Sequence, residues 1–380
     1  MWVQRLLDIG QEAVPGKTLV VIGPRRVGKT TLLKHYLANT DVTVAFYLGD
    51  DLTTQQAFGV PDSHLIRPYI GSASTLVIDE AQYIPNIGQT LKLINDLFQE
   101  ITVIISGSSS FDLAGQVGEP LTGRKVTKYL YPIALVELLS SHPLPHRAFQ
   151  ELLPSLLLYG MYPESITASN HQKKSEYLRE LVDSYLLRDI LAFQQVKGSH
   201  VMLQLLVMLA FQIGNEVSLT ELGSSLGLDK NTVSRYLNLL EKSFVIFRLG
   251  GFSRNLRSEV TRKAKFYFYD VGIRNAIINN FNSLEIRNDV GQLWENFIIV
   301  ERLKMRTYTN LYANQYFWRT WQQHEIDLVE EREGRLFAYE IKWTDRPVSP
   351  PKEWLKAYPD GSEWTVITPA NALSFLGIET

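Results

Sequence analysis

The segment Gly23-Pro24-Arg25-Arg26-Val27-Gly28-Lys29-Thr30 has the GxxxxGK[ST] spacing of the phosphate-binding loop known as Walker A. Its glycines let the backbone turn without a Cβ, so that amide N–H groups converge at a helix N-terminus, where the helix dipole favours an anion. We expect Lys29 to reach the β- and γ-phosphates of a nucleoside triphosphate and Thr30 to ligate Mg²⁺. Thr31 completes the predicted cofactor-binding segment.

The residues on either side of this loop favour a strand before it and a helix after it. Thr18-Leu-Val-Val-Ile22 is a continuous apolar run, typical of a strand that is buried on both faces. The residues from Thr31 to Leu37 continue as a helix. Strand, loop and helix in this order form the context in which such a loop binds ATP, so the sequence predicts an ATP site in a parallel α/β sheet.

A second buried strand ends in two acids and resembles a Walker B segment. Thr75-Leu-Val-Ile runs into Asp79 and Glu80, and acids at the carboxyl end of a strand lie where such sheets bind ligands. We expect Asp79 to hold Mg²⁺ through a water and Glu80 to accept a proton from the attacking water. A third strand, Ile101 to Ile105, leads to Ser106, which would orient that water. Without the Walker A loop, the two acids would be better interpreted as a solvated strand end.

Composition limits the classes of function. The chain has 380 residues, 45% of them hydrophobic, a net charge of −2 and no cysteine, which excludes disulfides, thiol catalysis and cysteine-bound zinc. An acid at Asp8 argues against a secretory signal, and the longest apolar stretch, Val201 to Ile213, is too short to span a membrane. We therefore expect a cytoplasmic protein without membrane contact.

The chain is predicted to hold four regions: an ATPase core at 1–134, a helical lid at 135–205, a winged helix with a basic linker at 206–287, and a small α/β domain at 288–380. Helical apolar spacing marks the lid region. The segments with this spacing are Leu135 to Leu139, Phe149 to Leu158, Lys173 to Gln194 and Val201 to Ile213.

The winged helix is predicted from two short helices over Ser218 to Glu241 that meet at Gly227, with Asp229 capping the second, followed by a strand over Phe244 to Leu249. The exposed face of the second helix carries side chains suited to phosphates and base edges. These candidate nucleic-acid contacts are Lys230, Asn231, Ser234, Arg235 and Asn238. A local basic segment follows, with Arg254, Arg257, Arg262, Lys263, Lys265 and Arg274. The alternative is a packing module with a solvated basic face.

Six of the seven tryptophans lie beyond Asn288, which indicates a separate domain. Its patterns predict a helix (Val290 to Thr307), three strands (Tyr316 to Arg319, Glu325 to Glu330, Leu336 to Trp343), a helix (Lys352 to Ala357), a strand (Trp364 to Thr368) and a helix (Ala370 to Phe375). The tryptophans themselves are expected to lie in the core or to pair across strands.

Two of these strands carry a D…ExK arrangement of Asp327, Glu340 and Lys342, as found in restriction-endonuclease-like folds. Strand alternation places Glu340 and Lys342 on one face, which Asp327 can also reach. Two carboxylates suit Mg²⁺ or Mn²⁺, which would polarise a phosphodiester, while Lys342 stabilises the developing charge. Glu295 is a further candidate ligand. A surface hairpin with alternating Glu and Lys is the alternative.

With these residues together, the chain resembles a family of bacterial and archaeal AAA+ superfamily ATPases that have a P-loop core, a helical lid, a winged helix and a C-terminal restriction-endonuclease-like domain. The resemblance covers nearly the full length. It rests on Gly23 to Thr30, Ile78 to Gln82, Ser106-Gly-Ser108, Leu121-Thr-Gly-Arg124, Tyr131-Pro132, Gly160-Met-Tyr-Pro-Glu164, Leu187-Arg-Asp189, Tyr269-Asp-Val-Gly272, Trp294-Glu-Asn-Phe297, Glu325-Ile-Asp327 and Glu340-Ile-Lys342.

The resemblance implies a five-stranded parallel core of the additional-strand type. It also makes Arg124 a candidate sensor of the γ-phosphate, either within the chain or across a contact in a homo-oligomer. Arg188 is a further candidate, with a structural ion pair to Asp189 as the alternative.

Two functions from different classes follow. The first is a Mg²⁺-dependent ATPase that acts as a switch or motor coupled to a DNA-engaging C-terminal half, with a candidate Mg²⁺-dependent nuclease site. The second is a non-catalytic ATP-gated scaffold whose endonuclease-like domain only binds protein or nucleic acid. A small-molecule phosphotransferase is disfavoured because it would leave the C-terminal half without a role.

Overall fold

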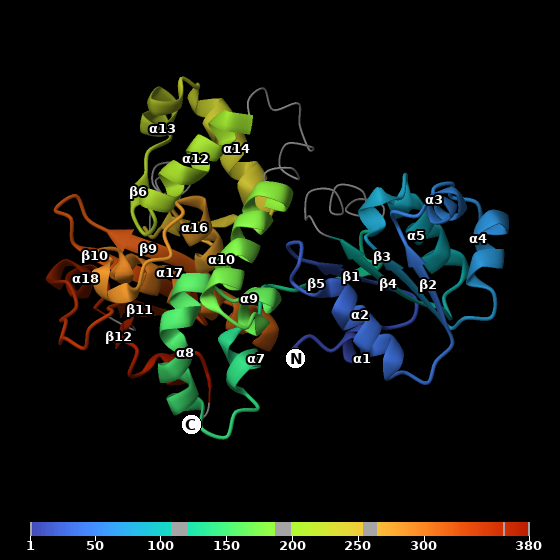
Figure 1. Ribbon diagram of the computed structural model, residues 1–380, viewed down its shortest axis with the longest axis horizontal. Coiled ribbons are helices and arrows are strands. Elements are labelled where there is room, and N and C mark those ends of the chain that lie inside the picture. Colours follow the sequence, from blue (N-terminus) through green and yellow to red (C-terminus); the bar gives the residue numbers. More distant parts are fainter. Residues whose placement is uncertain (1, 108–120, 187–198, 254–263, 360–361, 379–380) are drawn as a thin grey trace. The chain divides into compact units, whose positions relative to one another are not determined.

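The computed structural model describes residues 2–107, 121–186, 199–253, 264–359 and 362–378 (Figure 1). The chain forms two compact units. The N-terminal unit comprises Arg5–Pro132 together with Lys242–Phe244, and the C-terminal unit comprises Met1–Gln4, Ile133–Glu241 and Val245–Thr380.

The N-terminal unit is built on a five-stranded sheet. Its strands are β1 (Thr18–Ile22), β2 (Val44–Leu48), β3 (Thr75–Asp79), β4 (Thr102–Gly107) and β5 (Lys125–Tyr129). Its helices are α1 (Ile9–Glu12), α2 (Lys29–Ala38), α3 (Leu52–Phe58), α4 (Ser63–Ile70), α5 (Ile87–Leu97) and a 3₁₀ turn at Ala81–Tyr83. All strands are parallel, in the order β2-β3-β4-β1-β5, so the expected parallel α/β core is confirmed. Strand β4 is the additional strand between β1 and β3.

Burial in this sheet follows the apolar runs. Strands β1 and β3 are buried along their whole length, whereas the edge strands β2 and β5 are only partly buried. Because the strands are parallel, their carboxyl ends meet at one edge, where such sheets bind ligands. The pairing of Ile22 with Gly107 and of Ile78 with Ile105 brings the loop after β1 and the ends of β3 and β4 to that edge.

The C-terminal unit begins with helices. They are α7 (Leu135–Leu139), α8 (Pro145–Tyr159), α9 (Pro163–Thr167), α10 (His171–Glu180), a π-helical stretch (Leu181–Leu186), α12 (Ser199–Phe211), α13 (Leu219–Leu226) and α14 (Lys230–Lys242). Further along the chain lie α16 (Val271–Ile277), a 3₁₀ turn (Leu284–Ile286), α17 (Val290–Thr309), α18 (Lys352–Ala357) and α19 (Ala372–Phe375). Only the first part of the helix expected over Lys173 to Gln194 lies among the described residues.

A seven-stranded sheet runs through this unit in the order β12-β11-β10-β9-β7-β8-β6. The strands are β6 (Glu216–Val217), β7 (Ile246–Gly251), β8 (Ala264–Phe268), β9 (Asn314–Arg319), β10 (Glu325–Arg332), β11 (Arg335–Ile341) and β12 (Ser362–Ile367). The pairing of β7 with β9 joins the strands that precede residue 288 to the strands that follow it. In this pairing Gly250 and Gly251 lie parallel to Tyr316 and Phe317. Strands from both sides of the boundary proposed at residue 288 therefore belong to one sheet.

Helix α17 organises the core of this unit. Its residues Leu293, Trp294, Phe297 and Ile298 are almost completely buried and belong to one apolar cluster. A smaller cluster includes Trp318 of β9 and Trp354 of α18. The expectation that the tryptophans are core residues fails for Trp321, which is 90% exposed. None of the helices in the described part of the chain has the length and apolar content needed to cross a bilayer.

Candidate nucleotide site and C-terminal acidic cluster

The loop between β1 and α2 has the backbone that a phosphate cradle needs. A Cβ on Gly23 would lie 2.0 Å from the carbonyl oxygen of Leu130, so only glycine fits against the chain that follows β5. Gly28 has a φ of 96°, in the left-handed region that side chains other than glycine rarely adopt, and it caps the start of α2. The two glycines thus serve different purposes, a close approach at one and a turn at the other.

Lys29 and Thr30 lie at the first turn of α2. The Lys29 side chain is buried, and its ammonium donates to the carbonyl oxygens of Gly23 and Pro24 at 3.0 and 2.9 Å. The ammonium is therefore held inside the loop, where the phosphates of a nucleotide would lie. The Thr30 hydroxyl donates to Asp79 Oδ2 at 2.6 Å, so the two predicted Mg²⁺ groups are adjacent.

The ends of β3 and β4 complete the site. Ser106 donates its hydroxyl hydrogen to Asp79 Oδ1 and accepts the backbone N–H of Glu80 at 3.2 Å. Glu80 has a left-handed backbone with a φ of 54°, which turns the chain sharply after the strand. The structure thus brings Thr30, Asp79, Ser106 and Glu80 together, with Ser106 bonded to Asp79 and to the Glu80 backbone.

Of three further residues at the site, Arg25 and Gln82 belong to the predicted Walker A and Walker B segments, whereas Arg5 does not. Gln82 donates its side-chain amide to Glu80 Oε2 at 2.5 Å. The Arg5 guanidinium, buried beneath the loop, donates to the carbonyl oxygens of Val27 and Tyr131 at 2.9 and 2.7 Å. Arg25, a residue of the loop, donates to the Tyr83 hydroxyl at 2.6 Å. Gln82 stands next to the Walker B acids in sequence, whereas nothing in the local sequence connects Arg5 with the loop.

Arg124 does not lie at this site. It precedes β5, and its carbonyl accepts the N–H of Thr18 at the start of β1, at the opposite edge of the sheet from the Walker A loop. Its side chain pairs with Asp96 at 2.6 Å. The five residues of β1 separate it from the loop, roughly 16 Å, so an in-chain role at the γ-phosphate has no geometric support. Arg188 and Ser108 lie outside the described residues.

The five candidate nucleic-acid contacts all lie on the exposed face of α14. They are Lys230, Asn231, Ser234, Arg235 and Asn238. Asp229 caps this helix by accepting the N–H groups of Asn231 and Thr232 at 2.9 and 3.0 Å, and Gly227 ends α13 with a φ of 66°.

The basic segment expected after β7 needs a correction. Lys265 and Arg274 are buried and paired with carboxylates, because β8 and α16 point these side chains into the unit. They are therefore unavailable to DNA phosphates. Arg254, Arg257, Arg262 and Lys263 lie outside the described residues.

The C-terminal acids do converge. The Lys342 ammonium lies 2.6 Å from Glu340 Oε1 and 3.5 Å from Asp327 Oδ2, and the N–H of Ile341 donates to the same Asp327 oxygen at 2.8 Å. Burial raises the pKa of Glu340 to about 7, with a further contribution from the charge of Asp327. Asp327 is almost fully buried, whereas Lys342 is 40% exposed, so the cluster has one side open to solvent.

Glu295 of α17 is held by two groups of β8. The Tyr267 hydroxyl donates to Glu295 Oε1 at 2.6 Å, and the Lys265 ammonium lies 3.4 Å from the same oxygen. Lys265 also contacts Glu325. Burial raises the pKa of Glu295 to about 7, and the charge of Asp327 raises it further. Burial would lower the pKa of Lys265, but the surrounding carboxylates raise it well above its ordinary value.

The chemistry of Asp327 and Glu340 fits a hard divalent ion. Glu340 Oε2 is buried and makes no hydrogen bond, which leaves an oxygen donor for such an ion. Among the described residues no three His, Cys, Asp or Glu side chains are arranged to hold a metal. An ion at this cluster would therefore take at most two carboxylates and complete its coordination with water.

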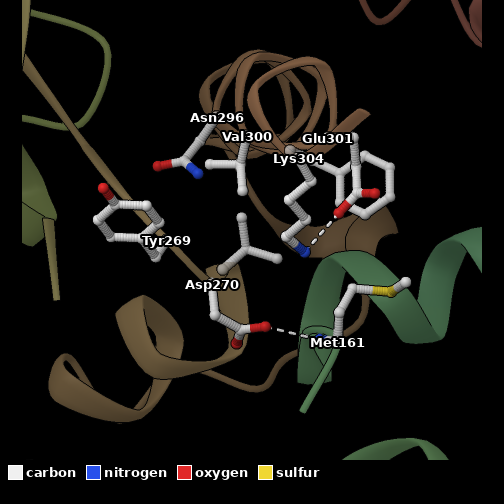
Figure 2. Close-up of a pocket in the computed structure, with 9 residues that line it drawn as sticks. Met161, Tyr269, Asp270, Asn296, Val300, Glu301 and Lys304 are labelled. Atoms are coloured by element: carbon white, nitrogen blue, oxygen red, sulfur yellow. Dashed lines mark hydrogen bonds and ion pairs between the residues drawn. The ribbon is translucent and has the colours of Figure 1, made fainter. Parts of the chain in front are cut away.

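A buried polar network joins two further motifs. Asp270 caps α16 and accepts the N–H of Met161 at 2.6 Å (Figure 2). A Cβ on Gly160 would lie 2.0 Å from Asp270 Oδ1, so the Gly160 and Asp270 segments require each other. On α17, Lys304 bonds Glu301 and the carbonyl of Ile133 at 2.7 and 3.1 Å. The cavity among these side chains measures about 10 Å³, too little for anything larger than a water molecule.

Comparison with known families shows which family the N-terminal unit matches. Residues 15–139 match the family described as "AAA domain". Residues 150–284 match "Domain of unknown function (DUF8612)", and residues 290–364 match "Domain of unknown function (DUF4143)". The chain therefore carries an AAA-type, P-loop ATPase-like domain at its N-terminal end.

Relatives occur in bacteria and archaea. The Mycobacterium tuberculosis protein "Uncharacterized protein Rv2008c" is 28% identical over 335 residues, 87% of this chain and 71% of that protein. The Methanocaldococcus jannaschii protein "Uncharacterized protein MJ1544" is 24% identical over 365 residues, 89% and 78% of the two chains. A solved structure, "Crystal structure of protein VC1899 from Vibrio cholerae", aligns with 95% of this chain and 93% of its own at 11% identity, with a TM-score of 0.17.

Proposed function

We propose that the chain is a Mg²⁺-dependent ATPase that acts as a switch or motor for its C-terminal half. The observation that carries the proposal is the convergence of Lys29, Thr30, Asp79 and Glu80 at one edge of the parallel sheet. The match of residues 15–139 to an AAA domain supports it.

Each residue has a defined part in this proposal. The loop amides and Lys29 bind the phosphates and compensate their charge. Thr30 and Asp79 would hold Mg²⁺, which supplies further neutralisation of the phosphate oxygens. Ser106 fixes the Asp79 carboxylate by donating to it. Glu80 accepts the proton of the attacking water, and the Gln82 amide, which donates to Oε2, leaves the second carboxylate oxygen for that water.

Glu80→Gln tests hydrolysis separately from binding. Because the amide cannot accept the proton, we expect ATP binding to be retained and turnover to fall by roughly 10²- to 10⁴-fold. Lys34→Ala is the control, since Lys34 is exposed on the same helix as Lys29. Turnover by Glu80→Gln at the wild-type rate would show that Glu80 is not the base.

The described part of 206–287 supports a winged helix as the partner-binding element. Helices α12, α13 and α14 are followed by the hairpin of β7 and β8, and β6 pairs with β8. The exposed polar face of α14 is suited to DNA, which we propose as the partner of the C-terminal half.

Mg²⁺- or Mn²⁺-dependent DNA cleavage is a second candidate function, favoured by the approach of Lys342 to both Asp327 and Glu340. Asp327 and Glu340 would hold the ion, which would polarise the phosphodiester, and Lys342 would stabilise the charge that develops. The test is incubation of supercoiled and single-stranded DNA with either ion. Cleavage should disappear in Asp327→Ala, and unchanged cleavage by this variant would reject the site. Absence of cleavage together with retained DNA binding would favour the ATP-gated scaffold.

A further inference from the structure

Lys265 is a buried lysine in the centre of the C-terminal acidic cluster. Its side chain is 1% exposed and extends from β8, between α17 and β10. The ammonium lies 3.4 Å from Glu295 Oε1 and contacts Glu325 Oε1. An ammonium removed from water to this extent is stable only where carboxylates compensate its charge. Lys265 and these two acids therefore form one electrostatic unit.

Among the groups around Glu295, the Lys265 ammonium is the main positive charge that compensates this carboxylate. The Tyr267 hydroxyl donates to Glu295 Oε1, and the backbone at Gly214 lies against the other Glu295 oxygen, which a Cβ there would approach to 3.2 Å. Glu325 has a second cation, because Arg319 Nε lies 3.4 Å from its Oε2. Arg319 also pairs with Glu216 at 3.4 Å and is thus shared.

Asp327 links this unit to the D…ExK cluster. Its charge raises the pKa of both Lys265 and Glu295, so it lies within electrostatic reach of the ammonium. Asp327 also lies 3.5 Å from the Lys342 ammonium. Asp327 is therefore within electrostatic reach of both Lys265 and Lys342.

We propose that the Lys265 ammonium is a built-in counter-ion that takes the place of a divalent cation beside Glu295 and Glu325. A Mg²⁺ ion gives up its water shell reluctantly, and here it would have to displace an ammonium that already satisfies these carboxylates. The wild-type chain accordingly binds divalent ions weakly at this cluster. This inference concerns the regulation of the proposed nuclease site and does not depend on ATP hydrolysis.

Thermal unfolding of the full chain without nucleotide tests the proposal. All seven tryptophans belong to the C-terminal unit, so their fluorescence reports on that unit. The chain should carry Asp79→Ala, which removes the acid of the other candidate metal site. In this background we expect Lys265→Met to lower the unfolding midpoint and millimolar Mn²⁺ to restore at least half of the loss. The midpoint of the chain with Lys265 intact should move by no more than about one degree with Mn²⁺.

Lys304→Met is the matched control. Lys304 is as fully buried as Lys265 and lies in the same unit, but among the described residues it makes an ion pair only with Glu301 and also donates to a carbonyl. We expect this variant to lose stability and to gain nothing from Mn²⁺. Rescue of both variants alike, or no rescue of Lys265→Met, would overturn the proposal.

Lys265→Met with Glu325→Gln provides a second variant if the single one fails to fold, because it leaves one uncompensated carboxylate fewer. Mn²⁺ binding, followed by electron paramagnetic resonance, should be at least tenfold tighter in this double variant than in Glu325→Gln alone. Equal affinities would overturn the proposal. Neither readout uses DNA, so a failure of every variant to cleave would reject the nuclease candidate without affecting this result.

Discussion

Glu80 has a backbone in the left-handed region and a carboxylate that Gln82 holds through its amide. The turn at Glu80 separates it from Asp79, so that one acid points to Thr30 while the other engages Gln82. Two neighbouring acids thus have different partners, as their proposed roles require.

Removing the Gln82 amide tests this arrangement. A hydrogen bond to a charged group contributes about 1.5–3 kcal/mol, so its loss at the base should change turnover by roughly tenfold or more. We expect Gln82→Ala to bind ATP as wild type does and to show an altered pH profile of turnover. The measurement is steady-state hydrolysis from pH 5 to 9. An unchanged rate and profile would show that Gln82 does not position Glu80.

Asp270 supports a prediction about pH. Burial raises its pKa to about 6, whereas an unfolded chain releases this proton near pH 4. The folded chain therefore binds the proton more tightly, and the stabilisation that this provides is present below about pH 4 and lost as the pH rises through 6. Asp270→Asn lacks this titration. Relative to wild type, its free energy of unfolding should rise by up to about 3 kcal/mol between pH 4 and pH 7.

Urea unfolding followed by tryptophan fluorescence measures this difference. The exposed Asp345 supplies the control, because Asp345→Asn makes the same chemical change at the surface of the same unit. A constant difference between Asp270→Asn and wild type would show that Asp270 does not titrate in this range.

The sequence predicted the positions of some site residues and not of others. Glycine spacing and apolar flanks predicted the Walker A segment, because both requirements are local. The contacts of Arg5, over a separation of 22 residues to Val27 and 126 to Tyr131, depend on the folded path of the chain and leave no local pattern. Lys265 shows the same limit, since a buried ion pair and a solvated basic residue look alike in sequence.

Helix α14 is the element that carries the proposed DNA contact. Its apolar residues Val233, Tyr236 and Leu240 are buried, so its polar residues form one exposed face. Periodicity alone predicted this division, and the same kind of pattern predicted α18 at its exact bounds and β3 at its apolar run.

Charge removal on α14 tests the DNA contact. Each phosphate contact should contribute about −0.9 to the slope of log affinity against log salt for duplex DNA. We expect Lys230→Ala with Arg235→Ala to weaken binding and to make the slope shallower by about 1.8 if both touch phosphate. Lys173→Ala, at an exposed position of α10, is the control and should leave the slope unchanged. Equal slopes for all three proteins would remove α14 from the interface.

In the sheet of the C-terminal unit, the strands could be predicted from the sequence but their order could not. Each strand of the 288–380 region was recognisable from its apolar pattern, but the parallel pairing of β7 with β9 was not. Gly250 and Gly251 are the residues of β7 that pair with Tyr316 and Phe317 of β9. Long-range pairing between strands that lie more than 60 residues apart is set by packing and leaves no local signal.

At the scale of the whole molecule, the account requires that nucleotide state changes what the C-terminal unit binds. Coupling free energies of 1–3 kcal/mol are typical and correspond to roughly 5- to 150-fold changes in affinity. We expect the DNA affinity of the chain bound to a non-hydrolysable ATP analogue to differ from that of the chain bound to ADP by at least about fivefold. Lys29→Ala should abolish the difference, measured by fluorescence anisotropy at fixed salt. Equal affinities in both nucleotides would mean that the units act independently.

Nucleotide binding by the Walker A loop is the claim on which the rest depends. The direct measurement is isothermal titration calorimetry of the full chain with ATP at millimolar Mg²⁺, alongside Lys29→Ala, whose ammonium no longer fills the loop. We predict a saturable heat with one site per chain for wild type and none for the variant. The absence of binding heat from wild type with ATP or GTP, or an equal heat from Lys29→Ala, would contradict the account.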